Sequence, residues 1–471
     1  MNRAKIICTI GPACNDPETL DGLLSSGMKV ARINFSHGGH EDFKSMITNL
    51  RTVAQKRGEP IAILGDLCGP KIRIGELEEE SVELIAGQKI TITTRDIKGS
   101  NVILSTTYPN LVSDVEKNNR ILIDDGRIEL KVIDVRPEEV HATVVIGGTI
   151  KPHKGMNLPG VNVSAPAISA KDFSDIEFAV REEIDFLALS FVRTPDDVIK
   201  AKKLISNYGS DIPVIAKIEK EEAVDAFEKI LATADGIMIA RGDLGVEMAS
   251  EQVPLIQKRI IKACNEAGKP VITATQMLES MTTQPNPTRA ETSDVANAVI
   301  DGSDAVMLSG ETAVGKYPIK AAETMQRIIN GVECEFGYGR SMIDHRLQSQ
   351  PTIEDAVTAA ACRAAELLKA KAIIAYTQSG STARRISKHR PRTSILAISP
   401  SESARRRLSL FWGVRSALVK DVLDTESMVS TAEKIAVANG YAVSGDIIVI
   451  TSGTPIGVAG STNLMTVHKV K

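Results

Sequence analysis

Aromatic residues are scarce in this sequence, and long apolar runs are missing. Phenylalanine, tyrosine and tryptophan together make up 3% of the 471 residues, although apolar residues of all kinds reach 43%. We therefore expect large cores built mainly from aliphatic side chains. No apolar run approaches the roughly 18 residues that a membrane-spanning helix requires. We expect no membrane partner.

Cysteine pairs and net charge are also lacking. The six cysteines are scattered, with no C-x-x-C pair, which argues against a disulfide framework or a zinc site and is typical of reduced thiols. The formal net charge is only -3, so nothing indicates nucleic acid as a main partner. The apolar run near the N-terminus is too short for a secretory signal and is interpreted as a strand. Together these features predict a cytoplasmic enzyme.

Short apolar runs that end in polar residues recur along the first two thirds of the chain. Helix-length amphipathic segments separate most of them, and strands that alternate with helices are typical of a parallel sheet. Eight such units predict a closed (β/α)8 TIM barrel, for which about 250 residues is typical. The runs lie at 5–11, 30–36, 61–67, 186–192, 213–219, 236–242, 270–276 and 305–311.

One interval between these runs is far longer than the others, because the third begins at residue 61 and the fourth at residue 186. The excess, 70–166, is rich in Gly, Asp and Thr and has segments typical of antiparallel strands and hairpins. We predict a small β-barrel domain inserted between barrel segments at 1–69 and 167–345. An insertion at the top of the barrel is well placed to act as a lid.

The strand and helix pattern restarts in the last quarter of the chain. Helical segments at 352–370 and 382–390 alternate with apolar runs at 372–377, 393–399 and 446–453. This alternation predicts a C-terminal α/β domain over 346–471, doubly wound.

The carboxyl ends of the predicted barrel strands carry polar side chains. In a (β/α)8 barrel these ends share one face, where the chemistry takes place. One such residue is about as often a structural cap as a functional group, but here five or more strands contribute at once. The set comprises Arg32, Asn34, Ser36, Asp66, Lys217, Glu219, Arg241, Asp243, Thr275, Gln276, Ser309 and Glu311.

The charges in this set predict metal-assisted chemistry on a small, highly anionic substrate. Glu219 and Asp243 offer carboxylate oxygens, and few protein ligands with open positions suit Mg²⁺ (or Mn²⁺) shared with a substrate phosphate. Lys217, Arg32 and the nearby Arg73 supply positive charge for a transferring phosphoryl group.

Many segments of the chain resemble pyruvate kinase. The similar stretches include "CTIGPAC", "ARINFSHG", "GDLCGPKIR", "KGMNLPGV", "AKIEK", "DGIMIARGDLGVE", "ITATQMLESM" and "PTRAETSDVANAVIDGSDAVMLSGETAVGKYP", and the resemblance covers essentially the whole chain. It implies transfer of the phosphoryl group of phosphoenolpyruvate to ADP, which gives pyruvate and ATP in the last step of glycolysis. It also implies a homotetramer.

The resemblance implies a role for each matching residue. Glu219 and Asp243 would bind Mg²⁺, and Arg73 and Lys154 would hold the nucleotide phosphates. The remaining roles are catalysis and substrate binding. Arg32 and Lys217 would contact the transferring phosphoryl group, and the backbone of Gly242 and Asp243 would bind the substrate carboxylate together with Thr275. Thr275, Ser309 and Glu311 would lie on the side where the enolate is protonated.

One stretch departs from the common pattern of the family. Many members need K⁺, at a site that here would comprise Asn34, Ser36, Asp66 and the carbonyl of Leu67. Those members have a glutamate after the Gly-Pro, whereas "GDLCGPKIRI" has Lys71. Its fixed ammonium can take the role of the monovalent ion, which resembles the K⁺-independent branch. We predict activity without K⁺, with a neutral substitution at the lid hinge as the alternative.

A second anion site is predicted in the C-terminal domain. The stretch "AYTQSGSTARRISKHRP" indicates a strand, a loop and a helix start, and such a loop can bind an anion. In the family this loop often binds a phosphorylated allosteric effector, and this domain contributes to oligomerisation. The alternative is an ordinary turn before a solvated basic helix. The candidate residues are Thr377, Ser379, Gly380, Ser381 and Thr382.

Two other functions remain open from the residues. One is a barrel enzyme that works on Mg²⁺-bound enolates, such as a pyruvate aldolase or a phosphoenolpyruvate carboxylating or mutase enzyme. Such an enzyme shares the carboxylate-held metal, but it predicts neither the inserted β domain nor Arg73 and Lys154 as nucleotide contacts. A catalytically inactive relative would have lost Lys217, Glu219, Asp243 or Thr275, and all four are present.

Overall fold

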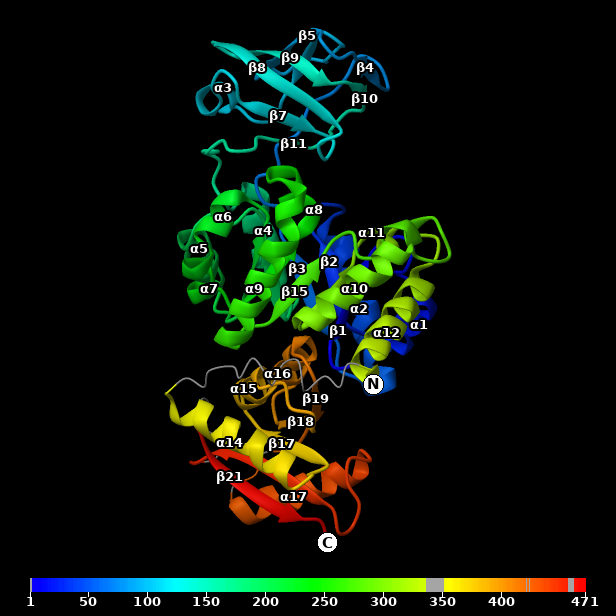
Figure 1. The fold of residues 1–471 in the computed structure, drawn as a ribbon, viewed down its shortest axis with the longest axis vertical. Helices are drawn as coiled ribbons and strands as arrows, with labels where there is room; N and C mark the ends of the chain where they lie inside the picture. The colour runs from blue at the N-terminus through cyan, green and yellow to red at the C-terminus, as the bar shows by residue number, and fades with distance from the viewer. Residues whose placement is uncertain (1, 336–350, 421, 423, 456–460) are drawn as a thin grey trace.

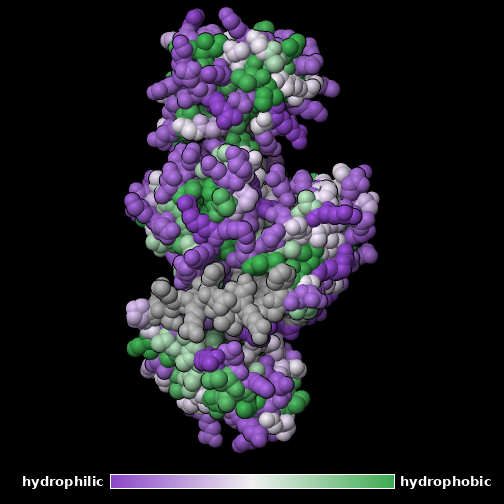
Figure 2. Space-filling model, in the orientation of Figure 1, coloured by the Kyte–Doolittle hydropathy of each residue, from purple (hydrophilic) through white to green (hydrophobic). Residues whose placement is uncertain are grey.

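Three units follow one another along the long axis of the molecule (Figure 1). The computed structural model describes residues 2–335, 351–420, 422, 424–455 and 461–471. A β-rich unit lies at one end, a barrel with its helices in the middle, and an α/β unit at the other end. The face seen in Figure 2 is mostly hydrophilic on the β-rich unit and the barrel, and hydrophobic patches are more frequent on the α/β unit. No described helix is both long and apolar enough to cross a membrane.

Eight parallel strands close into a barrel in the middle unit, in the order β1-β16-β15-β14-β13-β12-β3-β2. Each strand overlaps one of the eight predicted runs, so the predicted TIM barrel is confirmed. The strands are β1 Lys5–Ile10, β2 Met28–Asn34, β3 Ala62–Asp66, β12 Phe186–Leu189, β13 Val214–Ile218, β14 Gly236–Ala240, β15 Val271–Ala274 and β16 Ala305–Leu308.

Amphipathic helices surround the barrel. In α9, Ile256, Ile260 and Cys264 are buried at a spacing of four, so one stripe of the helix packs on the strands. Aliphatic side chains dominate both this outer layer and the barrel interior. The α-helices are α1 Pro17–Ser25, α2 His40–Arg57, α4 Ala170–Arg181, α5 Pro195–Asn207, α6 Glu221–Asp225, α7 Phe227–Thr233, α8 Arg241–Glu247, α9 Val253–Ala267, α10 Arg289–Asp301, α11 Gly310–Ala313 and α12 Pro318–Glu335.

The segment between β3 and α4 forms the β-rich unit, which we call the lid. Its strands make a two-stranded sheet, β10-β4, and a six-stranded sheet, β11-β7-β8-β9-β5-β6, around an aliphatic core. The elements are β4 Val82–Leu84, β5 Lys89–Thr93, β6 Ile103–Ser105, α3 Leu111–Asp114, β7 Arg120–Ile123, β8 Ile128–Arg136, β9 Glu139–Ile146, β10 Gly148–Ile150 and β11 Met156–Asn157.

The C-terminal unit is a five-stranded sheet, β19-β18-β17-β20-β21, in which only β21 runs antiparallel to its neighbour. One hydrophobic cluster packs α14 and α15 on the sheet, and a second packs α17 on it. This is the predicted α/β architecture. The elements are α14 Ile353–Leu367, β17 Ala372–Tyr376, α15 Ser381–Lys388, β18 Ser394–Ser399, α16 Glu402–Arg407, β19 Val414–Leu418, α17 Thr425–Ala438, β20 Ile447–Gly453 and β21 Thr462–Lys469. The exact domain boundaries stay predictions, and the one at 345/346 lies outside the described residues.

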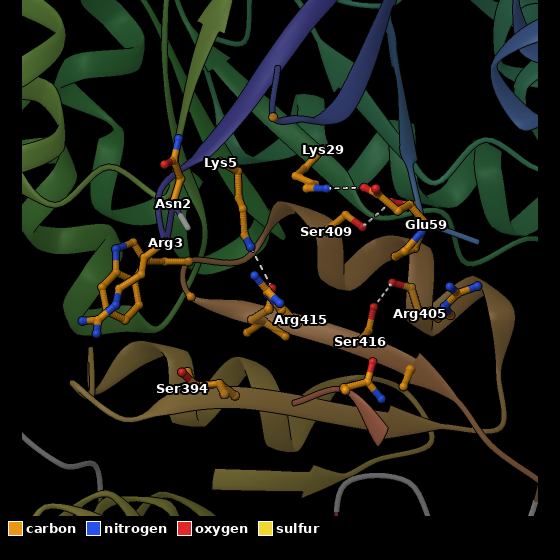
Figure 3. Close-up of a pocket in the computed structure, with 18 of the residues that line it drawn as sticks. Asn2, Arg3, Lys5, Lys29, Glu59, Ser394, Arg405, Ser409, Arg415 and Ser416 are labelled. Carbon is orange, nitrogen blue, oxygen red and sulfur yellow. Dashed lines mark hydrogen bonds and ion pairs between the residues drawn. The ribbon is translucent and has the colours of Figure 1, made fainter. Parts of the chain in front are cut away.

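The amino ends of the barrel strands pack against the C-terminal unit. Lys5 Nζ donates a hydrogen bond to Val414 O at 2.7 Å, and Arg390 Nη2 lies 3.0 Å from Asp304 Oδ1. A cavity of about 930 Å³ lies at this junction, and Figure 3 shows Lys5 and Arg415 beside it. The strand carboxyl ends, where the polar set was predicted, lie at the opposite end of the barrel.

Candidate active site

Lys217, near the end of β13, lies at the centre of a charged network. Its Nζ lies 2.8 Å from Glu219 Oε1 and 3.2 Å from Asp66 Oδ1. It also donates a hydrogen bond to Ser190 Oγ at 2.7 Å. Glu219 directly follows β13, and residues two apart in extended chain point to the same face, so Lys217 and Glu219 are presented together. The side chain of Lys217 is only 11% exposed, and these partners offset the cost of burying its charge.

Arg32, on β2, extends the network. Its Nε lies 2.6 Å from Asp66 Oδ2, and its Nη1 donates to Thr9 Oγ1 at 3.0 Å. Asp66, at the end of β3, is 1% exposed and is shared by the two cations. Strands β2, β3 and β13, with β12 between the last two, therefore bring together three of the residues predicted to act on a phosphoryl group or a cation.

The pKa values in this network follow from burial and from the neighbouring charges. Burial opposes the charge on Lys217, but the carboxylates of Asp66 and Glu219 outweigh it and raise its pKa. Burial likewise opposes the charge on Asp66, whose two cationic neighbours nevertheless lower its pKa. Burial raises the pKa of Glu219 despite the nearby ammonium, and the carboxylate of Asp243 raises it further.

The second oxygen of the Glu219 carboxylate is held by backbone. Phe191 N donates to Glu219 Oε2 at 2.6 Å, and Phe191 has a φ of +53°. Few residues other than glycine adopt this left-handed conformation. The strained turn after β12 directs this N–H at the carboxylate, so the orientation of Glu219 depends on a neighbouring strand.

Thr275 lies at a second strained turn, directly after β15. Its φ is +66°, which is unfavourable for a β-branched residue. Its Oγ1 accepts a hydrogen bond from Gly242 N at 2.8 Å, and its carbonyl accepts one from Arg241 Nη2 at 2.8 Å. Arg241 and Asp243 lie in the first turn of α8, just beyond β14. The contacts link Thr275 to the segment that carries Asp243.

Glu311 and Ser309 lie directly after β16. Burial raises the pKa of Glu311, although its carboxylate accepts hydrogen bonds from Ser309 N at 2.7 Å and from Leu278 N at 3.1 Å. The hydroxyl of Ser309 is buried and has no hydrogen-bond partner among the described residues. The Glu311 carboxylate thus connects the loop after β15, through Leu278, to the loop after β16, through Ser309.

Asn34 on β2 pairs with Asp66 on β3, so the positions expected around a monovalent ion lie close together. Ser36 N donates to Asn34 Oδ1 at 3.1 Å, and Ser190 Oγ donates to Leu67 O at 2.8 Å. The hydroxyl of Ser190 also lies 3.4 Å from Asp66 Oδ1. Lys71 is exposed, and its aliphatic chain lies beside Gly155.

The two predicted nucleotide contacts are held within the lid. Arg73 Nη1 donates to His153 O at 2.9 Å, and Lys154 Nζ lies 2.7 Å from Asp124 Oδ1. The structure thus places both cations on the lid but shows no contact between them and the Lys217 network.

The predicted effector loop connects β17 to α15, which begins at Ser381. Thr377 Oγ1 accepts a hydrogen bond from Gly380 N at 3.0 Å. Gly380 has a φ of +86°, a conformation that glycine adopts without strain. Thr382 already lies in the helix, and its hydroxyl is 2.7 Å from that of Thr462. The loop belongs to the C-terminal unit, which lies on the side of the barrel away from the lid (Figure 1).

Sequence reasoning missed three residues of the site: Thr9, Ser190 and Phe191. Ser190 directly follows the strand run "FLAL", so the rule applied to the other strand ends would have found it. Thr9 lies inside β1 and not at its end, and Phe191 acts through its backbone N–H. The side-chain type of these two residues therefore gives no indication that they belong to the site.

Comparisons with known proteins agree with this geometry. Residues 1–322 match the family described as pyruvate kinase, barrel domain, and residues 355–468 match the pyruvate kinase alpha/beta domain. Two pyruvate kinases, from Sporosarcina psychrophila and from Staphylococcus aureus strain MRSA252, are each 45% identical over all of this chain and 81% of their own length.

A solved structure shows the same arrangement. The crystal structure of a pyruvate kinase from Cryptosporidium parvum superposes with a TM-score of 0.94 at 39% identity, and the match covers 100% of this chain and 96% of that one. The fold, the ring of polar strand ends and these similarities lead to one conclusion: the chain belongs to the pyruvate kinase family of phosphotransferases.

Proposed function

We propose that this chain transfers the phosphoryl group of phosphoenolpyruvate to ADP, which gives ATP and pyruvate in the last step of glycolysis. The observation that carries this proposal is the buried cation Lys217, fixed by Asp66 and Glu219 where the barrel strands end. A phosphoryl transfer needs little covalent chemistry from the protein, so positioned charge supplies most of the catalysis.

Glu219 and Asp243 are the proposed ligands of Mg²⁺ or Mn²⁺. The donor set fits such an ion, because Glu219 and Asp243 are carboxylates that follow the paired strands β13 and β14. Burial raises the pKa of Glu219, and the charge of Asp243 adds to this. Among the described residues no group of three or more His, Cys, Asp or Glu side chains suits a metal. Substrate oxygens and water are left for the other positions, as is usual for Mg²⁺. When bound, the ion neutralises negative charge on the substrate.

Lys217 and Arg32 are proposed to act on the transferring group. Both are fixed by Asp66, so their positive charges need no reorganisation as negative charge develops on the phosphoryl oxygens. After transfer, the ammonium of Lys217 also stabilises the enolate.

Thr275 and the backbone of Gly242 and Asp243 are proposed to bind the carboxylate of the substrate. In the structure Gly242 N donates to Thr275 Oγ1. On binding, the Gly242 N–H and the Thr275 hydroxyl would donate to the substrate carboxylate instead. Thr275 then lies on the side where the enolate is protonated, with Ser309 and Glu311 behind it as support.

Arg73 and Lys154 are the proposed contacts for the nucleotide phosphates. Their location on the lid means that closure of the lid would bring them to the substrate and exclude water. We assign the loop at 377–382 to a phosphorylated effector, and we propose a cytoplasmic homotetramer, as in the family.

Lys71 is proposed to replace K⁺ beside Asn34, Ser36, Asp66 and Leu67. Lys71 lies exposed at the junction with the lid, so a closing lid can bring its ammonium toward this site. A fixed lysine charge would make the reaction independent of the ion.

The test follows pyruvate formation from phosphoenolpyruvate and ADP with Mg²⁺ in a K⁺-free buffer, before and after K⁺ is added. We expect the full rate before the addition and no rate after a chelator of divalent cations. A rate that appears only with K⁺ would overturn the role of Lys71. Turnover of phosphoenolpyruvate that does not depend on ADP would instead favour a related barrel enzyme of enolate chemistry.

A further inference from the structure

Glu247, the last residue of α8, has a buried carboxylate with two donors from different units. Its Oε1 accepts from Lys220 Nζ at 2.6 Å and from Asn157 Nδ2 at 2.8 Å. The Glu247 side chain is 3% exposed and that of Lys220 is 11% exposed. Asn157 lies in β11 of the lid, whereas the other two residues belong to the barrel.

Each member of this triad is a close neighbour of a proposed site residue. Lys220 directly follows Glu219, and Asn157 lies three residues after Lys154. Glu247 ends the short helix that begins with Arg241, Gly242 and Asp243. In Figure 1, β11 lies directly above α8. The triad therefore connects the lid to both segments that carry the metal ligands.

We propose that Glu247 and Asn157 are positioning residues that couple the placement of the lid to α8, and through α8 to Asp243 and Gly242. The inference rests on the proposed function where that function assigns the nucleotide to the lid and the substrate and metal to Gly242 and Asp243. A helix of seven residues is about 10 Å long, so a shift at its last residue reaches its first turn.

Two physical features make the coupling strong. Loss of one hydrogen-bond donor to a buried carboxylate costs free energy. If Asn157 moves with the lid, Glu247 is therefore expected to move with it, and if Glu247 is fixed, it restrains Asn157. At its other end α8 is anchored, because Arg241 Nη1 lies 2.6 Å from Asp294 Oδ1 and Arg241 Nη2 donates to Thr275 O. A displacement of α8 would therefore also change the position of Thr275.

The experiment compares Asn157→Ala and Asn157→Asp with Asn101→Ala, a matched change on an exposed lid asparagine. We expect Asn157→Ala to raise the KM for ADP about fivefold, the size of one net hydrogen bond, and to raise the KM for phosphoenolpyruvate as well, because α8 carries Gly242 and Asp243. Asn157→Asp should raise the KM for ADP further, because it places a second carboxylate beside Glu247. Asn101→Ala should match the unchanged protein.

Amide hydrogen exchange provides a readout that does not depend on activity. In Asn157→Ala we expect faster exchange over 242–248, with no change in Asn101→Ala. If either the KM for ADP or this exchange stays unchanged in both Asn157 variants, the coupling is wrong. If the unchanged protein makes no pyruvate from ADP, the proposed function fails, and the exchange measurement alone then decides the coupling.

Discussion

Ser190 holds the ammonium of Lys217 from the end of β12, a strand to which no functional residue was assigned from the sequence. Its hydroxyl accepts from Lys217 Nζ at 2.7 Å and donates to Leu67 O at 2.8 Å. A hydroxyl suits this place because it can accept from a cation and donate to a carbonyl at once. It orients Lys217 without adding a charge to the site.

Removal of this hydroxyl should slow the reaction more than it weakens substrate binding. We expect Ser190→Ala to lower kcat about tenfold, the loss of one hydrogen bond to a charged group, because Lys217 keeps its carboxylate partners but loses an orienting contact. The KM for ADP should change little. Steady-state kinetics check this against Ser206→Ala, at an exposed position of α5. An unchanged kcat would show that Asp66 and Glu219 suffice to orient Lys217.

At the scale of elements, short turns between strands and helices carry the specific geometry. The turns after β12 and β15 place Phe191 and Thr275 at positive φ, where they direct a backbone N–H and a hydroxyl into the site. The turn after β17 uses Gly380 in the same region instead, ahead of α15. Strands and helices thus supply a rigid frame, and these turns direct the polar groups.

The loop before α15 is testable as an effector site. Wild-type protein is assayed at rising phosphoenolpyruvate with fructose 1,6-bisphosphate, a sugar monophosphate or AMP. We expect one of them to lower the concentration for half-maximal rate, and we expect Ser381→Glu to abolish that shift, because its carboxylate repels a phosphate. Ser206→Glu, on the exposed face of α5, serves as the control. No shift with any of these compounds in the wild type would indicate an ordinary turn.

At the scale of the whole molecule, the two proposed sites lie on opposite sides of the barrel (Figure 1). The lid covers the carboxyl ends of the strands, whereas the C-terminal unit packs on their amino ends through Lys5, Arg390 and Asp304. Within one chain, any influence of an effector on the proposed active site therefore passes through this junction and along the barrel.

Lys5 at this junction makes stability depend on pH. Burial lowers its pKa to about 7, and the cations Lys29 and Arg415 contribute to this. The carboxylates of Glu333 and Asp304 oppose the shift without cancelling it. Between about pH 7 and the normal lysine value near 10.5 the unfolded chain binds more protons at this residue than the folded one. The contribution of Lys5 to stability is therefore unfavourable below pH 7 and improves as the pH rises through this window.

Lys5→Met should remove this cost. We expect the variant to be more stable than the wild type at pH 7 by a few kcal/mol, roughly the free energy of such a pKa shift, and its advantage to shrink toward pH 10. Midpoints of unfolding at pH 7, 8.5 and 10 measure the difference, with Lys203→Met on the exposed face of α5 as the control. An advantage that does not change with pH would contradict the assigned pKa.

The sequence by itself determined the succession of elements. The period of apolar residues predicted all eight barrel strands, the long interval before Phe186 indicated the insertion, and the rule that parallel strands end on one face selected Lys217, Glu219 and Asp66 before any contact was known. These inferences succeed because they depend on local periodicity and on a general property of barrels.

Only the tertiary structure decided which atoms meet. Ser190 holds Lys217, Asn157 contacts Glu247, and Lys5 is buried against Val414. Each pair lies more than twenty residues apart and is fixed by how neighbouring strands and whole units pack. Residue type alone does not predict burial or partners. A lysine on the surface is a solvated charge, whereas a lysine in a core can act in catalysis or destabilise the fold.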